Sequence, residues 1–186
     1  MSVCDLCKKR EVKVTFSSDG SQEKLCRSCY NEIIAEELGV TLEETPEMMT
    51  AIDDQGVTRI FAVEARLDPV GIFFEAVENI DYGYEFAVYG ALDCKQSELY
   101  QQLVDKVNRG VQTRYIHTAT MSSGQSANYI PKNYLVGRLE YDENNESVPM
   151  TIIDGKPYTW DELGRLLGAY EGFQFKLKLS DLTDEE

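Results

Sequence analysis

Alternating apolar and polar positions predict strands in several parts of the chain. Val12, Val14 and Phe16 alternate with polar residues near the N-terminus, which is the period of a strand with one buried face. Further strand-like runs lie at about 57–67, 70–78, 84–90, 134–141 and 148–153. Short gaps separate the first three of these runs, and short gaps favour an antiparallel meander over parallel crossovers.

The same alternation predicts a last strand near the C-terminus. In residues 173–179, Phe and Leu occupy every second position, and Gln174, Lys176 and Lys178 occupy the positions between them. This pattern predicts one apolar face and one polar face.

Apolar residues at helical spacing predict three helices. The first helix ends near Gly39, a residue type favoured at helix C-termini, and the second ends near Asn108-Arg109-Gly110. The third begins at Thr159, because Thr159 and Glu162 have the spacing of a capping box. The apolar positions of the three helices are Tyr30, Ile33, Ile34 and Leu38; Leu99, Leu103, Val104 and Val107; and Leu163, Leu166, Leu167 and Tyr170.

These elements predict an α+β protein with a small module and a larger domain. We expect a cysteine-containing module over 1–40, an acidic linker over 41–56, an acidic α+β domain over 57–180 with a mainly antiparallel sheet and two helices, and a frayed acidic tail over 181–186. A short helical piece is expected around 47–51. Residues 117–130 are rich in Ser, Thr, Gly and Ala, and predict a long irregular loop.

Four of the five cysteines form two CxxC pairs, Cys4 with Cys7 and Cys26 with Cys29. Each pair lets one tight turn present two sulfurs to one ion, and the spacing C-x2-C-x18-C-x2-C is typical of zinc modules. A redox dithiol needs one CxxC only. An iron site with four thiolates is the alternative, but the Gly that usually follows its CxxC turns is replaced by Lys8 and Tyr30. We therefore predict structural Zn²⁺, whose four ligands leave no open position for substrate.

The first forty residues resemble a known family. Cys4-Asp5-Leu6-Cys7-Lys8-Lys9-Arg10-Glu11, followed by Val12-Lys13-Val14 and closing on Leu25-Cys26-Arg27-Ser28-Cys29, is similar to the N-terminal zinc module of the protein-arginine kinase activator family. The resemblance implies a treble clef, in which the last two ligands lie at the start of a helix. It implies a fold and no activity. The stretches around Trp160–Arg165 and Tyr170–Phe175 resemble the ending of bacterial proteins that contain a zinc module.

The formal net charge of −15 is uneven along the chain. Residues 1–40 hold six Lys and Arg against seven Asp and Glu, whereas residues 41–186 hold twelve against twenty-six. An acidic surface disfavours binding to nucleic acid and anionic lipid. No run reaches the roughly 18 apolar residues that span a membrane, so we expect a protein of the cytoplasm.

Candidate catalytic residues are few. His117 is the only histidine and Cys94 the only cysteine outside the pairs, and nothing in their spacing brings them together. A tyrosine-rich domain with an acidic surface favours a protein partner, since tyrosine is enriched at interfaces. We therefore expect a non-enzymatic interaction or adaptor protein. The alternatives are a nucleic-acid-linked regulator that uses Lys8, Lys9, Arg10 and Lys13, and an enzyme or small-ligand binder that uses the 117–130 loop.

Overall fold

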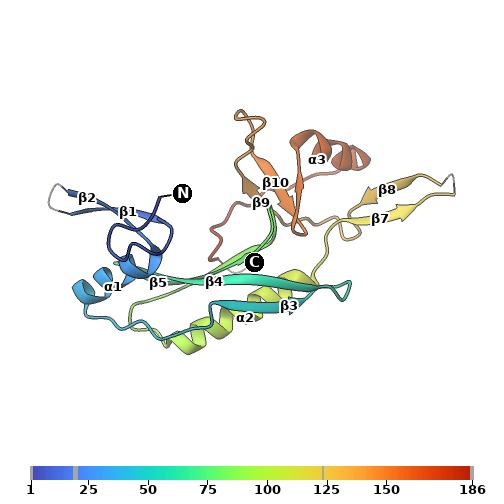
Figure 1. The fold of residues 1–186 in the computed structure, drawn as a ribbon. Coiled ribbons are helices and arrows are strands. Elements are labelled where there is room, and N and C mark those ends of the chain that lie inside the picture. The colour runs from blue at the N-terminus through green and yellow to red at the C-terminus, as the bar shows by residue number, and fades with distance from the viewer. Residues whose placement is uncertain (1, 19–20, 123, 185–186) are drawn as a thin grey trace.

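A computed structural model describes residues 2–18, 21–122 and 124–184 of the 186-residue chain. Its helices and antiparallel strands confirm the α+β class. Figure 1 shows an N-terminal hairpin and helix at one end, a longer sheet in the middle, and a group of short strands with a helix above the other end.

The N-terminal unit consists of a turn, a hairpin and a helix. β1 (Val14–Ser18) pairs antiparallel with β2 (Ser21–Leu25), and α1 (Arg27–Leu38) follows directly. α1 ends at Gly39, whose φ of 65° is left-handed, so glycine serves there as predicted.

The central unit is a four-stranded sheet with the order β3-β4-β5-β6, in which every neighbouring pair is antiparallel. Its strands are β3 (Met48–Ile52), β4 (Thr58–Asp68), β5 (Gly71–Glu78) and β6 (Glu85–Gly90). β4, β5 and β6 confirm the three runs that alternation and short gaps predicted as a meander.

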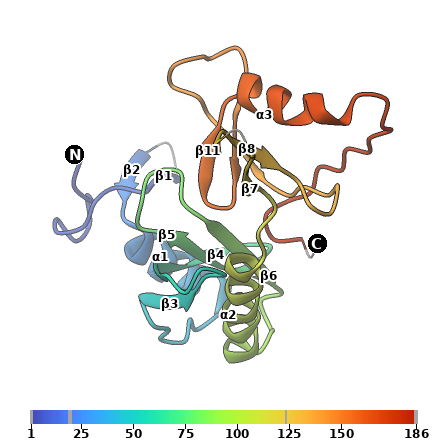
Figure 2. The ribbon, with the colours of Figure 1, turned by 90° about the vertical axis from the view of Figure 1, so that its right-hand side faces the viewer.

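One face of this sheet is covered by α2 (Gln96–Gln112), which lies beneath it in Figure 1 and crosses it in Figure 2. The helix buries Leu99, Leu103 and Val107, which confirms three of the four predicted apolar positions. Val111 is also buried, whereas the predicted Val104 is half-buried. The sheet contributes Phe61, Leu67, Ile72 and Phe74 to the same core. Burial of apolar side chains of this size stabilises a fold by about 1.5–3 kcal/mol each, so this is the main core of the molecule.

The expected helical piece around 47–51 is wrong, because those residues belong to β3. β3 pairs with β4 over its whole length, from Met48 opposite Ala62 to Ile52 opposite Thr58. Five residues of the segment interpreted as a linker therefore form an edge strand of the sheet.

The third unit packs around a separate small core. β9 (Arg138–Glu140), β10 (Met150–Ile153) and β11 (Lys156–Tyr158) form a sheet with the order β11-β10-β9, and α3 (Trp160–Leu167) and a short 3-10 helix η1 (Gly168–Tyr170) follow. The capping box at the start of α3 is confirmed, since Thr159 and Glu162 bond each other's backbone N–H. The buried residues of this core are Ile116, Ile130, Ile153, Leu163 and Leu166.

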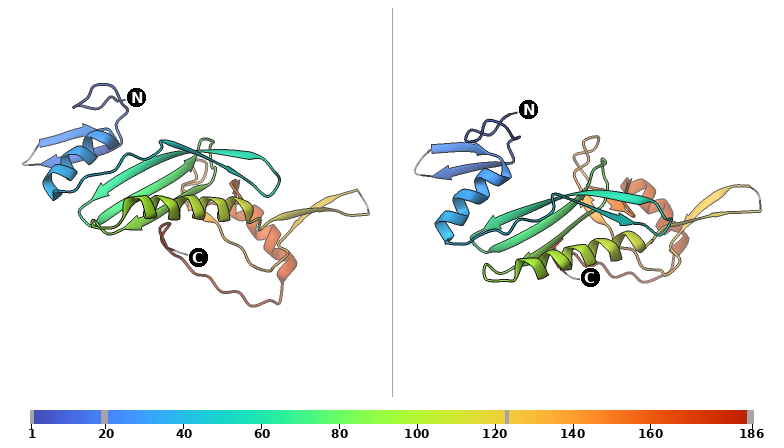
Figure 3. Two further views of the ribbon diagram at one scale, coloured as in Figure 1. Left: turned by 90° about the horizontal axis from the view of Figure 1, so that it is seen from below. Right: turned by 60° about the horizontal axis from the view of Figure 1, so that its bottom comes forward.

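Two expectations for this unit are wrong. Residues 117–130 contain a hairpin of β7 (His117–Thr120) and β8 (Ser126–Tyr129), which projects from the body in Figure 3. Residues 173–179 form no strand: they are extended, unpaired and exposed. Alternation of side chains is compatible with a strand, but a strand also needs a neighbour to accept its backbone hydrogen bonds.

The tail is held rather than frayed as far as Asp184. Lys106 of α2 donates from Nζ to the backbone oxygens of Leu182 and Asp184, at 2.7 Å each. Residues 185–186, the end of the predicted tail, lie outside the described residues.

Candidate metal centre

The first CxxC pair lies in a tight turn that backbone bonds hold to β2. Cys4 donates its N–H to Arg10 O at 2.9 Å, and Lys8 donates to Cys4 O at 3.0 Å. Lys8 has a left-handed φ of 55°, which lets the chain reverse directly after Cys7. Asp5 and Lys24 exchange two further bonds of 2.8 Å, which attach this turn to the hairpin.

The second pair lies at the junction of β2 and α1. Cys26 is the N-cap of α1, with an extended backbone, and Cys29 follows in the first turn. Because Tyr30 donates to Cys26 O at 3.1 Å, the helix begins directly at this cysteine. This order of turn, hairpin and helix start, with the last two cysteines at the start of the helix, is the arrangement that the resemblance implied.

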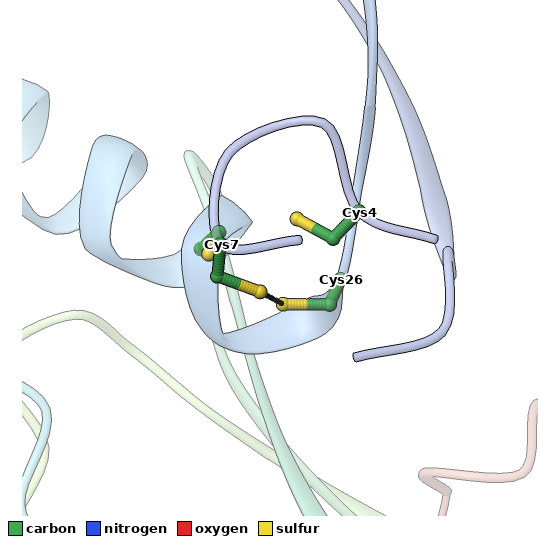
Figure 4. A group of neighbouring side chains, drawn as sticks. Cys4, Cys7 and Cys26 are labelled. Carbon is green, nitrogen blue, oxygen red and sulfur yellow. Dashed lines mark hydrogen bonds between the residues drawn. The ribbon is translucent and has the colours of Figure 1, made fainter. Parts of the chain in front are cut away.

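The four sulfurs converge on one point. The Sγ atoms of Cys4, Cys7, Cys26 and Cys29, here called the cysteine cluster, all lie within 4.8 Å of one another. Figure 4 shows the Sγ atoms of Cys7 and Cys26 facing each other, 3.8 Å apart. A tetrahedron with metal–sulfur bonds of about 2.3 Å has edges of about 3.8 Å, so this separation fits two ligands of one ion.

Burial and backbone N–H donors shift the pKa values of the thiols in the cluster. Burial raises the pKa of Cys4, but the N–H groups of Cys26, Cys7 and Leu6 lower it by more, to about 6. The backbone N–H groups of Arg10 and Lys9 likewise lower the pKa of the Cys7 thiol.

The pKa of the Cys29 thiol shifts in the opposite direction, upward. Burial and, to a smaller extent, the side chains of Cys26, Cys4 and Cys7 together raise the pKa of Cys29 to about 12, because a further negative charge among sulfurs is unfavourable. A divalent cation at the centre removes that repulsion. The cluster is therefore a candidate metal centre with four protein ligands, and a tetrahedral ion bound there has no free position for substrate.

The helix that carries Cys29 also packs against the sheet. Ile34 of α1 is 4% exposed and belongs to the main core. The Tyr30 hydroxyl donates to Asp68 Oδ1 at 3.3 Å, and the Asn31 side chain bonds the backbone of β4. α1 is thus shared by the cysteine cluster and the central sheet.

The other candidate residues lie elsewhere. Cys94 is half-buried against the main core, and burial raises its pKa, which lowers the reactivity of a thiol. His117 opens β7, where its ring centroid lies 5.9 Å from that of Tyr129. Neither residue lines the two hollows described next.

Two hollows lie outside the cysteine cluster. One, of about 290 Å³, is lined by a single segment, Leu139–Asp142 with Glu146–Pro149. The other holds about 20 Å³, room for one water, and is lined by charged and tyrosine side chains that include Asp53, Arg59 and Tyr158.

A buried charge network beside the smaller hollow was missed by the sequence analysis. Arg59 Nη2 lies 2.9 Å from Asp53 Oδ2, and Arg59 Nη1 lies 3.1 Å from Glu78 Oε1. The Arg59 guanidinium also lies 5.7 Å from the ring centre of Tyr84. In the sequence, Asp53 has the appearance of a turn residue. Only the register of β3, β4 and β5 brings it together with Arg59 and Glu78. Since Asp53 and Glu78 also accept backbone N–H groups, the network is satisfied internally.

The basic residues beside the first CxxC pair are exposed. Lys8, Lys9, Arg10 and Lys13 all lie at the surface. Lys8 lies 3.6 Å from Asp5, and the Arg10 guanidinium donates to the Ser28 hydroxyl.

Comparison with family models divides the chain into three consecutive parts. Residues 3–41 match a domain of unknown function (DUF7685), residues 43–112 match another (DUF7686), and residues 117–184 match a third (DUF7713). These parts coincide with the N-terminal unit, the central sheet with α2, and the third unit. No curated protein and no solved structure matches the chain. The resemblance to the protein-arginine kinase activator family stays a prediction.

None of the helices in the described residues is long and apolar enough to cross a membrane.

Proposed function

We propose that this chain is a zinc-stabilised, non-enzymatic interaction protein of the bacterial cytoplasm, which binds another protein through its acidic α+β part. Four convergent cysteine sulfurs suit Zn²⁺, a borderline-soft ion that prefers tetrahedral thiolate sites. A reducing compartment keeps such thiols available for metal. The ion would hold the N-terminal unit in shape, because a unit of about forty residues has too little core to fold alone.

The observation that carries the interaction role is the exposed aromatic and aliphatic surface of the third unit. Tyr134 and Tyr141 are 57% and 61% exposed, and Phe175 is 92% exposed. Exposed large aromatic side chains are typical of protein-binding sites, and tyrosine is enriched among the residues that contribute most binding energy. The acidic charge of residues 41–186 favours a partner with a basic surface.

Two measurements test the proposal. Elemental analysis of the purified chain should find about one zinc per chain, and Cys26→Ser should lose it while Cys94→Ser keeps it.

The second measurement concerns the partner. Immobilised full-length chain should enrich a specific protein from bacterial lysate. The purified pair should bind more weakly as salt rises, because salt screens the charge attraction. Iron in place of zinc would contradict the metal assignment, and no enrichment over resin without the chain would contradict the interaction role.

A second candidate role is nucleic-acid binding, favoured by the exposed side chains of Lys8, Lys9, Arg10 and Lys13. Phosphate contacts of this kind weaken steeply with salt. A mobility-shift assay at low salt, with duplex and single-stranded probes, tests it. Lack of retardation with excess protein would remove this candidate and leave the first one intact.

A further inference from the structure

A short C-terminal segment of this chain has a strand pattern and no strand neighbour. Residues 173–179, here called the strap, alternate Phe or Leu with Gln or Lys. The four apolar side chains are highly exposed: Phe173 64%, Phe175 92%, Leu177 73% and Leu179 73%. Burial of such side chains contributes about 1.5–3 kcal/mol each, so the strap presents a large unused binding surface.

The strap is fixed at both ends. Before it, the Tyr170 hydroxyl donates to Ile130 O at 2.9 Å and accepts the Ile130 N–H at 3.1 Å. After it, Lys106 Nζ holds the backbone oxygens of Leu182 and Asp184. Figure 3 shows the segment between these anchors running extended and apart from the sheet. A segment held extended loses less conformational entropy when it pairs with another strand.

The same chain has an open sheet edge at β3. Glu47 O accepts the N–H of Val63 at 2.8 Å. Since antiparallel ladders alternate, the backbone groups of Met48, Thr50 and Ile52 point away from β4, toward the outside of the sheet. The opposite edge is less open, because Lys106 Nζ donates to Ala87 O of β6 at 3.0 Å.

The β3 edge also has an exposed apolar face. Met48 and Ile52 are 60% and 57% exposed, and the neighbouring Ile60 of β4 is 46% exposed. These residues lie on the sheet face opposite α2, since the residues between them, Met49 and Ala51, pack into the main core. A strand added at β3 can therefore place its apolar side chains beside Met48 and Ile52.

The strap and the β3 edge carry opposite charges. Residues 41–58, which contain β3, carry four carboxylates besides the buried Asp53 and no Lys or Arg, whereas the strap carries two Lys and no carboxylate. Opposite charges at a strand pair stabilise it, and like charges destabilise it.

We propose that the strap of one copy of this chain pairs with the β3 edge of a second copy, as a fifth strand of its sheet. Phe173, Phe175, Leu177 and Leu179 then lie beside Met48 and Ile52, and the lysines face the acidic residues that flank β3. Backbone bonds supply affinity and the apolar row supplies register, as in other strand additions. Phe175 belongs both to this self-association surface and to the surface proposed above for a protein partner, and the experiments below distinguish the two roles.

The first test compares edge and strap variants with a matched control. Sedimentation equilibrium of the zinc-loaded chain should show self-association, and Phe175→Lys should weaken it at least tenfold. Thr50→Pro should weaken it equally, because it removes an outward N–H and no bond to β4. Val70→Lys alters a 67%-exposed apolar residue outside both surfaces and should leave association unchanged. A monomer at every concentration, or variants that associate like the wild type, would overturn the proposal.

The double variant Phe175→Lys with Thr50→Pro distinguishes one contact from two. If strap and β3 edge meet, the two changes remove the same contact, and the double variant should be little weaker than either single one. Fully additive losses would show that the two sites contact different things and would refute the pairing. Circular dichroism of each variant checks that the fold is retained.

Disulfide trapping tests whether pairing occurs between copies. In a Cys94→Ser background, a chain with Leu177→Cys is mixed with a chain that has Thr50→Cys, and mild oxidation should give a cross-linked dimer. If the cross-link forms only when one chain carries both changes, the contact is internal and the inference fails.

If Phe175→Lys abolishes capture of a foreign protein while the wild-type chain is monomeric, the strap binds that partner and the self-pairing is wrong. The proposed function then stands without the self-pairing.

Discussion

The side chain of Asn31 in α1 accepts the backbone N–H of Leu67 in β4 at 3.1 Å, and its amide donates to Ala65 O at 2.8 Å. Both partners lie on the side of β4 that faces β3, just beyond the point where β3 begins. One carboxamide thus takes the place of a missing strand and closes the ladder at the junction of the N-terminal unit and the sheet.

Asn31→Ala should destabilise the whole chain. Each unpaired buried backbone group costs about 1–3 kcal/mol, so we expect a loss of roughly 2–4 kcal/mol in the free energy of unfolding. Urea unfolding followed by circular dichroism measures it. The neighbouring exposed residue provides the control, because Glu32→Ala should change stability by less than about 0.5 kcal/mol. Equal stabilities for the two variants would mean that water replaces the amide.

Loss of one cysteine ligand should unfold the N-terminal unit. Apparent binding free energies of structural zinc sites are about 10–16 kcal/mol and are coupled to folding. We therefore expect Cys26→Ser, or removal of the ion by a chelator, to abolish hydrogen-exchange protection in β1, β2 and α1. Cys94→Ser should keep that protection. A Cys26→Ser chain that retained zinc and a protected hairpin would contradict the assignment.

Low pH should lower the free energy of unfolding, because protonation of Asp53 weakens the junction between β3 and β4. Burial raises the pKa of this carboxyl, but the N–H of Val57 and the Arg59 side chain lower it by more, and the net shift is downward. A carboxylate with a lowered folded pKa stabilises the fold above its unfolded value of about 3.9, and the stabilisation is lost as pH falls through the folded pKa.

Unfolding free energies measured between pH 7 and pH 3 test this effect. Asp53→Asn should be less stable than the wild type at pH 7, and the difference should shrink below about pH 4. Any acid sensitivity of the metal centre is common to both proteins and cancels in the difference. Asp54→Asn is the matched control and should follow the wild type at every pH.

Two helical glycines should respond to alanine with opposite signs. A Cβ at Gly110 of α2 would overlap the ring of Phe86, whereas a Cβ at Gly164 of α3 meets nothing within 4 Å. Alanine favours a helix by about 1 kcal/mol over glycine, but overpacking a core costs about 1–3 kcal/mol. Thermal melts should show Gly164→Ala stabilised and Gly110→Ala destabilised. A stabilised Gly110→Ala would mean that Phe86 moves aside freely.

Local patterns predicted the parts of the fold that depend on local chemistry. The CxxC spacing identified all four members of the cysteine cluster, because a tight turn places both sulfurs of a pair. Alternation identified β4, β5 and β6, and the capping box at Thr159 located the start of α3. Each of these features is determined by residues a few positions apart.

The predictions that were wrong concern segments whose structure depends on pairing partners distant in the sequence. Met48–Ile52 is a strand because β4 pairs with it, whereas Phe173–Leu179 has a better strand pattern and no neighbour. β7 and β8 are polar, so their pairing left no hydrophobic alternation to detect. Asn31 is one polar residue in a helix, and its backbone partners lie 34 and 36 positions away.

The position of Asn31 links metal supply to the behaviour of the sheet. When the ion is absent and α1 unfolds, the Ala65–Leu67 segment of β4 loses the carboxamide that closes it. Unpaired strand edges are templates for aggregation. Chains without the ion would therefore carry two exposed edge segments, at β3 and at β4. The metal-bound cysteine cluster thus also keeps this segment of β4 covered, and the newly made chain is most prone to aggregation before its metal arrives.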